Sequence, residues 1–248
     1  MEGIETLQRW MDESSRIVFF GGAGVSTESG VPDFRSPDGL YADNLGTKYL
    51  RSTESGIPDF RSVDGLYHQQ YQYPPETILS RSFFDRQPEE FYRFCRSKML
   101  CLDAKPNAAH KKLAELERGG RLRSVVTQNI DGLHQAAGSR RVWELHGSVL
   151  RNRCMSCGKL WPVSAVAESS GVPRCACGGV IKPDVVLYEE SLDAQVLEGA
   201  LEDIRQADLL IIGGTSLVVY PAAGLVNYYR GDRLVLINKS PTQIGRAH

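Results

Sequence analysis

Short runs of consecutive apolar residues recur along this chain, separated by stretches with helical spacing. The runs are Ile17–Phe20, Val125–Thr127, Leu209–Ile212 and Leu234–Ile237. Strands that are apolar on both faces are typical of a parallel sheet covered by helices on each side. The segments between them, such as Ala108–Glu117 and Leu192–Arg205, have the length and periodicity of helices. This alternation predicts an α/β protein with a Rossmann-like, doubly wound parallel sheet.

Glycines and small polar residues follow each of these runs. They form the stretches Gly21-Gly22-Ala23-Gly24, Gln128-Asn129-Ile130-Asp131 and Gly213-Gly214-Thr215-Ser216, and the single residue Asn238. Ligands of such sheets bind beyond the carboxyl ends of the strands, so the pattern predicts a nucleotide site. Ordinary turn chemistry also favours these residue types and is the alternative for any one turn. Thr27 replaces the third glycine of the usual dinucleotide fingerprint, so we expect a phosphate turn of a non-standard type.

Four cysteines form two close pairs, Cys154 with Cys157 and Cys175 with Cys177. Two short cysteine turns that face each other supply the four thiolates of a tetrahedral zinc site. Four protein ligands leave no open position, so we expect this zinc to be structural. A redox cysteine pair or two disulfides are the alternatives, but no strand–helix pattern of a thioredoxin site flanks Cys154.

Composition and charge narrow the class of protein. The chain has 248 residues, 42% of them hydrophobic, which is enough for one large domain with a small satellite. Its formal net charge of −1 argues against a general nucleic-acid binder, which would be basic. We see no apolar run of membrane-spanning length and no signal peptide, and Cys95 and Cys101 are expected as reduced thiols. We therefore expect a cytoplasmic protein that contacts neither membrane nor nucleic acid directly.

An internal duplication lies downstream of the first glycine-rich turn. Residues 26–41 read STESGVPDFRSPDGLY, residues 52–67 read STESGIPDFRSVDGLY, and fourteen of the sixteen positions are identical. A single repeat does not indicate a solenoid, which needs at least three units. Because only one copy can occupy a given place beside a cofactor, the other copy or the residues between them are expected to form an insertion.

The assembled motifs resemble the sirtuins, the family of NAD-dependent protein deacylases. The matching stretches are Gly22–Ser26, Gly30–Arg35, Pro106–His110, Thr127–Asp131, Glu144–Gly147, the four zinc cysteines, Lys182–Val186, Gly214–Ser216 and Ile237-Asn238. They occur in the family's order and cover nearly the whole chain, and the short second cysteine pair is similar to that of bacterial members. The resemblance implies an NAD-dependent protein lysine deacetylase that transfers acetyl from lysine to ADP-ribose and releases nicotinamide. Acetyl-lysine proteins or peptides are the expected substrates, because no tyrosine and arginine pair for a carboxylated acyl group is found.

Site residues follow from the same resemblance. His146 is the expected general base, a role that suits an imidazole titrating near neutral pH, and Asn129 is the second expected catalytic residue. The expected cofactor-binding residues are Gly22, Ala23, Gly24, Thr27, Asp33, Phe34 and Arg35 around the diphosphate, Gln128, Asn129, Ile130, Asp131 and His146 around the nicotinamide ribose, and Gly214, Thr215, Ser216 and Asn238 around the adenosine. Val185, Val186, Leu187 and Tyr188 are expected to pair with the substrate as an added strand, a plain buried strand being the alternative.

Three parts of the chain are expected. A Rossmann-like NAD-binding domain comprises residues 1–30, 106–150 and 184–248. The duplicated cofactor loop and a helical module occupy 31–105, and a zinc-binding module occupies 151–183. Together the last two predict a small zinc-ribbon and helical domain beside the sheet.

Two features depart from the sirtuin pattern. The duplication falls in the cofactor loop, where we favour Asp33, Phe34 and Arg35 over the second copy's Asp59, Phe60 and Arg61. The sequence also stops shortly after Asn238, where relatives continue through a further strand and helix, and we expect lower stability or cofactor affinity as a result.

Three other functions stay open at this point. A catalytically impaired module would bind NAD or acetylated peptide without turnover. A zinc ribbon that binds nucleic acid and an enzyme that ADP-ribosylates proteins are the remaining alternatives.

Overall fold

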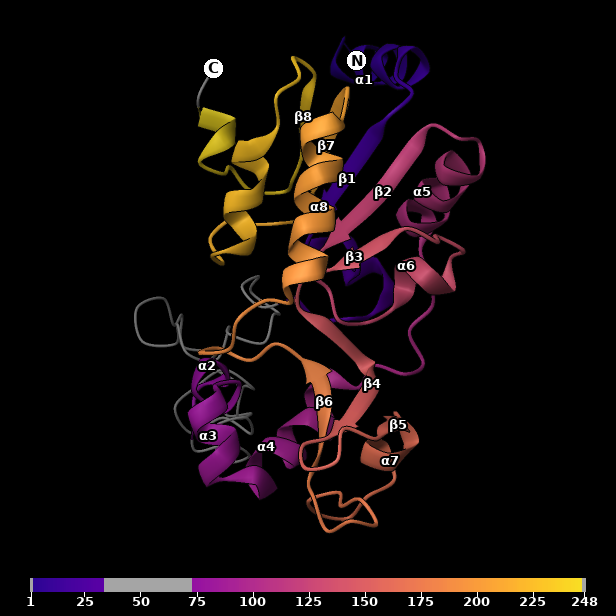
Figure 1. Cartoon of the computed structure of the whole chain (residues 1–248). Helices are drawn as coiled ribbons and strands as arrows, with labels where there is room; N and C mark the ends of the chain where they lie inside the picture. The colour runs from indigo at the N-terminus through magenta and orange to yellow at the C-terminus, as the bar shows by residue number, and fades with distance from the viewer. Residues whose placement is uncertain (1, 34–72, 247–248) are drawn as a thin grey trace, which may run out of the picture.

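The computed structural model describes residues 2–33 and 73–246, which form a larger and a smaller domain (Figure 1). The larger domain contains a five-stranded sheet in the order β3-β2-β1-β7-β8. Its strands are β1 (Ile17–Gly21), β2 (Leu122–Thr127), β3 (Val142–Glu144), β7 (Leu209–Gly213) and β8 (Leu234–Ile237). All neighbouring pairs are parallel, which confirms the predicted fold class.

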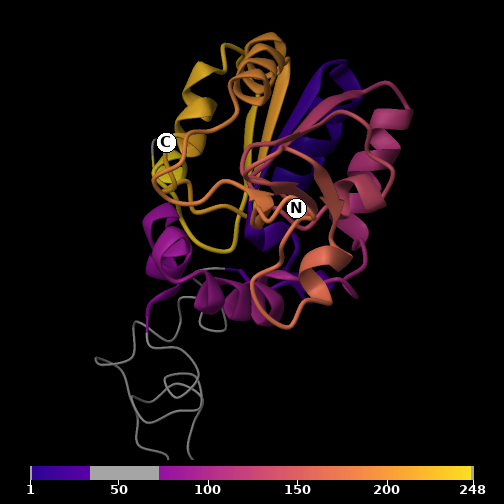
Figure 2. The same ribbon diagram turned by 60° about the horizontal axis from the view of Figure 1, so that its bottom comes forward.

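Alternate residues of the central strands face two separate apolar cores. Val18 and Phe20 of β1 pack with α8 (Ala194–Gln206) and the 3-10 helix η5 (Ala222–Tyr228) on one face of the sheet. Ile17 and Phe19 pack on the other face, with α1 (Glu2–Glu13) and α5 (Ala108–Arg118). Figure 2 shows the sheet between these two layers. Burial on both faces explains why the strands read as continuous apolar runs.

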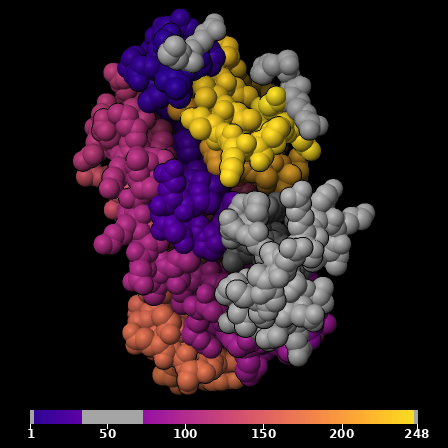
Figure 3. Space-filling model, turned by 180° about the vertical axis from the view of Figure 1, so that it is seen from behind, coloured from indigo at the N-terminus to yellow at the C-terminus, as the bar shows by residue number. Residues whose placement is uncertain are grey.

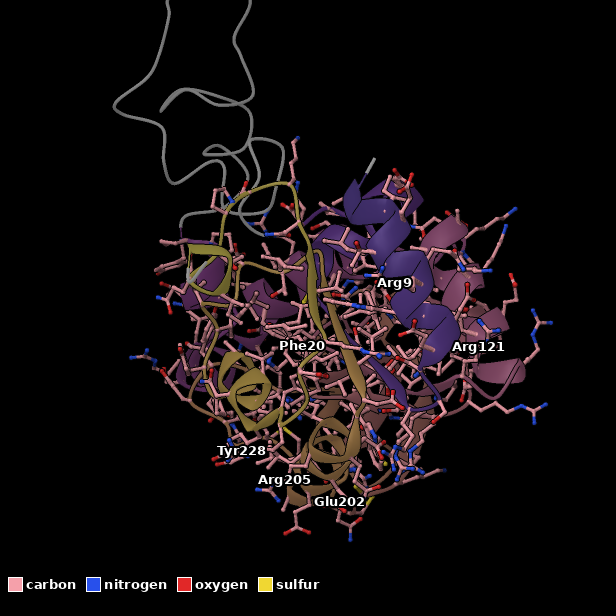
Figure 4. The ribbon with its side chains drawn as sticks, turned by 90° about the horizontal axis from the view of Figure 1, so that it is seen from above. Arg9, Phe20, Arg121, Glu202, Arg205 and Tyr228 are labelled. Atoms are coloured by element: carbon pink, nitrogen blue, oxygen red, sulfur yellow. The ribbon has the colours of Figure 1, made fainter. Side chains whose placement is uncertain are left out.

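Helix α8 lies against the sheet with one side and faces solvent with the other. Figure 4 shows Phe20 inside the domain and Glu202 of α8 at its rim. Arg205 lies over the ring of Tyr228, 5.1 Å from its centre, and so links α8 to η5. The helix begins two residues later than the sequence predicted, because the Asp193 side chain accepts hydrogen bonds from the N–H groups of Gln195 and Val196 and caps it.

The smaller domain contains an antiparallel sheet in the order β5-β4-β6. Its elements are β4 (Gly147–Cys154), β5 (Leu160–Pro162), β6 (Ile181–Val185), α2 (Pro75–Ile78), α3 (Arg81–Arg86), α4 (Pro88–Phe94), the π-helix η4 (Cys95–Met99) and α7 (Ser164–Ala167). Aromatic residues of α3 and α4 share one apolar core with Cys154, Cys175 and Ile181. The helical and zinc modules therefore pack as one body, at the opposite end of the molecule from α1 (Figure 3).

Short elements complete the described chain. They are the 3-10 helices η1 (Ala23–Val25), η2 (Thr27–Ser29) and η6 (Ile244–Arg246) and the helix α6 (Leu133–Ala136). No helix within residues 2–33 and 73–246 is long and apolar enough to cross a membrane.

A buried carboxylate ties α8 to the edge of the larger sheet. The Asp203 side chain is fully buried and accepts hydrogen bonds from Arg123 of β2 (2.5 Å), from Arg141 (2.7 Å) and from the indole N–H of Trp143 in β3 (2.7 Å). Burial alone raises the pKa of Asp203, but the hydrogen bonds from Arg141, Trp143 and Arg123 outweigh it and lower the pKa. The carboxylate therefore stays charged and stabilises the fold.

We predict that Asp203→Ala lowers the free energy of unfolding by about 2 kcal/mol or more, because two guanidinium groups and an indole lose their acceptor. The exposed neighbour Glu202→Ala is the control and is expected to change it by less than about 0.5 kcal/mol. Denaturant unfolding measures both. A lowered native pKa contributes stability above the unfolded value, so the difference between wild type and Asp203→Ala should shrink as the pH falls below about 3.9. An equal effect of the two substitutions would contradict this assignment.

Candidate active site and zinc centre

Two glycine-rich turns meet where the order of the larger sheet reverses, between β1 and β7. Gly22 N–H donates to Gly213 O (3.2 Å) and Gly24 N–H to Gly214 O (2.8 Å). A Cβ on Gly24 would lie 2.9 Å from Gly214 Cα, and Gly214 itself has φ +57°. The turns therefore approach each other as only glycines allow. Glycine-rich turns at the switch point of a parallel sheet suit the diphosphate of a dinucleotide such as NAD.

Asn129 and Asp131, which follow β2, are held by a buried serine from the first turn. The Ser26 hydroxyl donates to Asp131 Oδ2 (2.7 Å) and accepts from Asn129 Nδ2 (3.0 Å). His110 Nε2 lies 3.4 Å from the same hydroxyl, and the Asn107 amide donates to Val25 O (2.7 Å). The start of α5 thus contacts Val25 and Ser26, and Ser26 in turn binds both polar side chains.

His146 lies at the joint between the two domains, after β3 and before β4. Its Nδ1 is 3.0 Å from the carbonyl oxygen of Gln128. A carbonyl only accepts, so Nδ1 carries the proton and Nε2 keeps its lone pair. Burial lowers the pKa of His146, and the hydrogen bond to Gln128 opposes this only in part. The imidazole is therefore a neutral base at neutral pH.

Close packing next to His146 explains the glycine that follows it. A Cβ on Gly147, which has φ +74°, would lie 1.9 Å from Asp184 O. The Val186 N–H donates to His146 O (3.0 Å). The backbone leaving β6 is thus joined directly to the residue that carries the base.

Gln128 connects three of the predicted site segments. Its N–H donates to Gly21 O (3.0 Å), its side-chain amide donates to Thr215 Oγ1 (3.0 Å), and its carbonyl orients His146. The structure therefore brings the ends of β1, β2 and β7 to one place. The predicted residues gathered there are Gly22, Ala23, Gly24, Gln128, Asn129, Asp131, His146, Gly214 and Thr215.

Other predicted residues lie around this centre. The Thr27 hydroxyl donates to Gly24 O (3.1 Å), and the Ile130 carbonyl accepts from Val149 N–H (3.0 Å). Asp33 is half-buried and Ser216 follows Thr215 on the surface. Asn238 directly follows β8, and its side-chain amide donates to Ser240 O (2.8 Å). Phe34 and Arg35, like the second copy's Asp59, Phe60 and Arg61, lie outside the described residues.

The predicted substrate run differs from a simple strand. β6 ends at Val185, and Val186, Leu187 and Tyr188 continue beyond it. Tyr188 N–H donates to Leu79 O (3.0 Å) and Tyr188 O accepts from Arg81 N–H (3.0 Å), so its backbone serves the helical module. Leu187 N–H donates to Glu190 (2.8 Å). Among the described residues, the Val186 carbonyl has no partner, which makes it the available acceptor of this run.

The four predicted zinc ligands come together in two tight turns. Their sulfur atoms all lie within 4.8 Å of one another. Cys154 Sγ is 3.5 Å from Cys177 Sγ, and Cys157 Sγ is 3.7 Å from Cys175 Sγ. Zn–S bonds of about 2.3 Å at tetrahedral angles place sulfurs about 3.8 Å apart, so the site fits zinc and no disulfide is formed there.

Sequence reasoning did not assign two of the residues that shape the site. Ser26 and His110 are fully buried and support Asn129 and Asp131, yet neither was a predicted site residue. Both lie inside stretches that carry the sirtuin resemblance, Gly22–Ser26 and Pro106–His110. Their place as polar residues within the matched motifs was the sequence signal that would have found them, while their burial is known from the structure.

Comparison with known proteins decides the family. The sequence model of the Sir2 family matches residues 22–50 and 51–221. The chain belongs to the Sir2 family. The break between the two matched stretches falls just before the second copy of the duplication, residues 52–67.

Bacterial relatives of this Sir2-family chain are named NAD-dependent protein deacetylase. The one from Clostridium perfringens (strain 13 / Type A) is 54% identical over 242 residues, 97% of this chain and 89% of the relative. The one from Cutibacterium acnes (strain DSM 16379 / KPA171202) is 50% identical over 243 residues, which are 98% of this chain and 90% of the relative. The expected family and its bacterial type are confirmed.

Solved Sir2 structures have the same fold. One of Sir2 with p53 peptide and NAD+ has a TM-score of 0.77 at 36% identity, covering 98% of this chain and 89% of that one. One of Sir2 bound to acetylated peptide has a TM-score of 0.77 at 35% identity, and the match covers 98% of this chain and 89% of that one. With the four-cysteine cluster, these neighbours confirm the predicted parallel sheet and a small domain whose cysteines are positioned to bind zinc.

We predict that Cys157→Ser abolishes stoichiometric zinc binding, because the three remaining cysteines do not complete a four-coordinate site. The smaller domain should then melt at a lower temperature. Metal content by atomic emission, about one zinc per wild-type chain, and a thermal melt measure this. Cys101→Ser is the control and should keep its zinc. Full zinc content in Cys157→Ser would show that the cluster is not the metal site.

Proposed function

We propose that this chain deacetylates protein lysines in an NAD-dependent reaction, with acetyl-lysine peptides as substrates and His146 as the general base. The orientation of His146 carries this proposal. Its Nδ1 is committed to the Gln128 carbonyl, so the basic Nε2 is the free nitrogen at the joint between the domains. The name of the relatives, NAD-dependent protein deacetylase, supports the same reaction.

The residues around His146 suit the nicotinamide half of the cofactor. When bound, NAD supplies a ribose carbon that accepts the acyl oxygen as nicotinamide leaves. Ser26 holds the polar side chains of Asn129 and Asp131 in fixed orientations. The two side chains would therefore bind the cofactor without first changing their orientation. His146 would act as the base toward a hydroxyl of the bound cofactor's ribose, and the Gln128 carbonyl keeps its ring in the required tautomer.

The glycine turns and their neighbours suit the rest of the cofactor. Gly22, Ala23, Gly24 and Thr27 would hold the diphosphate, and Gly214, Thr215, Ser216 and Asn238 the adenosine. Asp33, Phe34 and Arg35 of the first copy would cover it. This assignment rests on the meeting of the β1 and β7 turns at the switch point of the sheet.

The acetyl-lysine peptide would lie against the run Val185–Tyr188. Val186 joins His146 through its N–H and has an unpartnered carbonyl among the described residues. That carbonyl is placed to accept an amide N–H of the substrate. We therefore narrow the predicted strand addition to Val186 as its main hydrogen-bonding residue.

We infer a cytoplasmic protein with no direct contact to nucleic acid. The net charge of −1 gives no basic footprint for a phosphate backbone. The relatives are bacterial deacetylases. Binding of a labelled DNA duplex at low salt would contradict the inference that the protein makes no direct contact with nucleic acid.

Turnover tests the function directly. An acetyl-lysine peptide is incubated with the full chain with and without NAD, and peptide and nicotinamide are quantified by mass spectrometry. We expect loss of acetyl only with NAD, matched one for one by nicotinamide. Folded, zinc-loaded protein without turnover would instead indicate an impaired module, and label transferred from NAD to protein would indicate ADP-ribosylation.

We predict that His146→Ala lowers kcat by about 100-fold or more while peptide and NAD still bind, because the base is lost and the backbone contacts remain. In wild type, the rate should fall on the acid side as His146 takes up a proton. Since burial lowers its pKa, this fall should have its midpoint below the ordinary value of about 6.5. A rate that is unchanged in His146→Ala, or an acid limb centred above 6.5, would contradict the role.

We predict that Phe34→Ala raises the KM for NAD by about tenfold, and that Phe60→Ala changes it by less than about twofold. The first copy begins at Ser26, which contacts Asn129 and Asp131, so the start of this copy lies inside the site. Initial-rate kinetics with varied NAD compare the two matched variants. The reverse order would assign the cofactor loop to the second copy.

A further inference from the structure

Glu189 adopts a backbone conformation that side chains other than glycine rarely accept. Its φ is +75°, and Leu217 is the only other non-glycine residue with positive φ in the described part of the chain. Left-handed backbone at a non-glycine residue is unfavourable, so something in its surroundings holds it there. Glu189 directly follows Tyr188, at the end of the run assigned to the peptide.

The contacts of the Glu189 side chain explain the conformation. Its Oε2 accepts from the backbone N–H of Ser82 (2.8 Å), and its Oε1 accepts from the Ser82 hydroxyl (3.0 Å). Both oxygens of one carboxylate are therefore bound by one residue of α3. Hydrogen bonds to a charged acceptor are stronger than neutral ones, which offsets the unfavourable φ.

The neighbours of Glu189 are joined to the same helix. Tyr188 pairs with Ser80 in an isolated parallel bridge, and Glu190 binds Arg81 (3.1 Å) and Lys182 (3.1 Å). Figure 1 shows the segment after β6 crossing to α2 and α3. Glu190 is half-buried and ties this segment to β6 as well, whereas the exposed Glu189 binds Ser82 of the helical module.

The position of Val186 depends on these anchors. Val186 is bound to His146 through its N–H, and only Leu187 separates it from Tyr188. A segment fixed at His146 and at α3 holds the Val186 carbonyl at one distance from the base. Without the Glu189 contacts, this end would be held by the Tyr188 backbone and by Glu190, and the Val186 carbonyl would keep its direction less firmly.

We propose that Glu189 is a positioning residue for the peptide substrate, which acts by clamping the segment after β6 onto Ser82. The inference rests on the proposed binding of an acetyl-lysine peptide at Val186. It predicts that Glu189 sets peptide affinity and leaves NAD affinity unchanged. Ser82 is its partner, so the two residues act as one unit.

The test measures the Kd of a fluorescent acetyl-lysine peptide by anisotropy, using the full zinc-loaded chain without NAD, so that binding is read independently of turnover. Glu189→Gly removes both acceptors and should weaken peptide binding by about tenfold. Glu189→Gln keeps an acceptor for Ser82 N–H and a donor for its hydroxyl, and should stay within about threefold of wild type. NAD affinity and the melting temperature should change little in either, because glycine relieves the left-handed backbone.

Ser82→Ala supplies the second arm of the test. The double variant with Glu189→Gly should bind the peptide no more weakly than Glu189→Gly alone, since the clamp is already open. Glu89→Gln, an exposed carboxylate on α4, is the control for charge and should match wild type. Unchanged peptide affinity in Glu189→Gly, or fully additive effects of the two substitutions, would overturn the clamp.

The outcomes separate this inference from the proposed function. Wild type that binds the peptide but does not release acetyl with NAD would contradict the deacetylase, while the Glu189 comparison would still decide the clamp. Wild type that turns over normally with no effect of Glu189→Gly would contradict the clamp alone. Wild type that binds no acetyl-lysine peptide would contradict both.

Discussion

The site depends on the parallel pairing of β1 with β2 on one side and β7 on the other. Parallel strands in register end at the same edge, so Gly21, Thr127 and Gly213 lie side by side there. The next residues of each strand are then forced together, and Gln128 can bind Gly21, Thr215 and His146 at once. A slip of one residue would turn every side chain of β1 to the other face and separate these groups.

Burial of β1 on both faces secures that register. Val18 and Phe20 fill one core and Ile17 and Phe19 the other. The two cores are covered by helices, of which α5 and α8 have side-chain caps at their N-termini, and Asp203 joins α8 to the β2–β3 edge of the sheet. The polar site is thus built on the least mobile kind of element, a central strand, which suits a base that must stay aligned.

The two domains meet at His146, and residues of both hold it in place. Its ring is oriented from the larger domain by the Gln128 carbonyl, and its backbone carbonyl is bound from the smaller domain's side by Val186. Most helices and strands of the smaller domain are short, so its core relies on packed aromatic residues and on the four cysteine sulfurs. A zinc ion bound by these cysteines would therefore stabilise the domain that carries the proposed peptide-binding run, Val185–Tyr188.

Sequence alone determined the α/β class, the four longer strands of the larger sheet, the zinc ligands and the family, because apolar runs, cysteine spacing and ordered motifs are local signals. It also named Gln128, Asn129, Asp131 and His146, which lie in such motifs. It did not determine that β6 ends at Val185, that Tyr188 serves the helical module, or that Ser26 and His110 support Asn129 and Asp131. Those contacts join residues far apart in the chain, and they form only when the strands are in register and the two domains pack. The left-handed backbone of Glu189 is likewise a tertiary result, since nothing in its sequence neighbourhood requires it and only Ser82 of α3 makes it favourable.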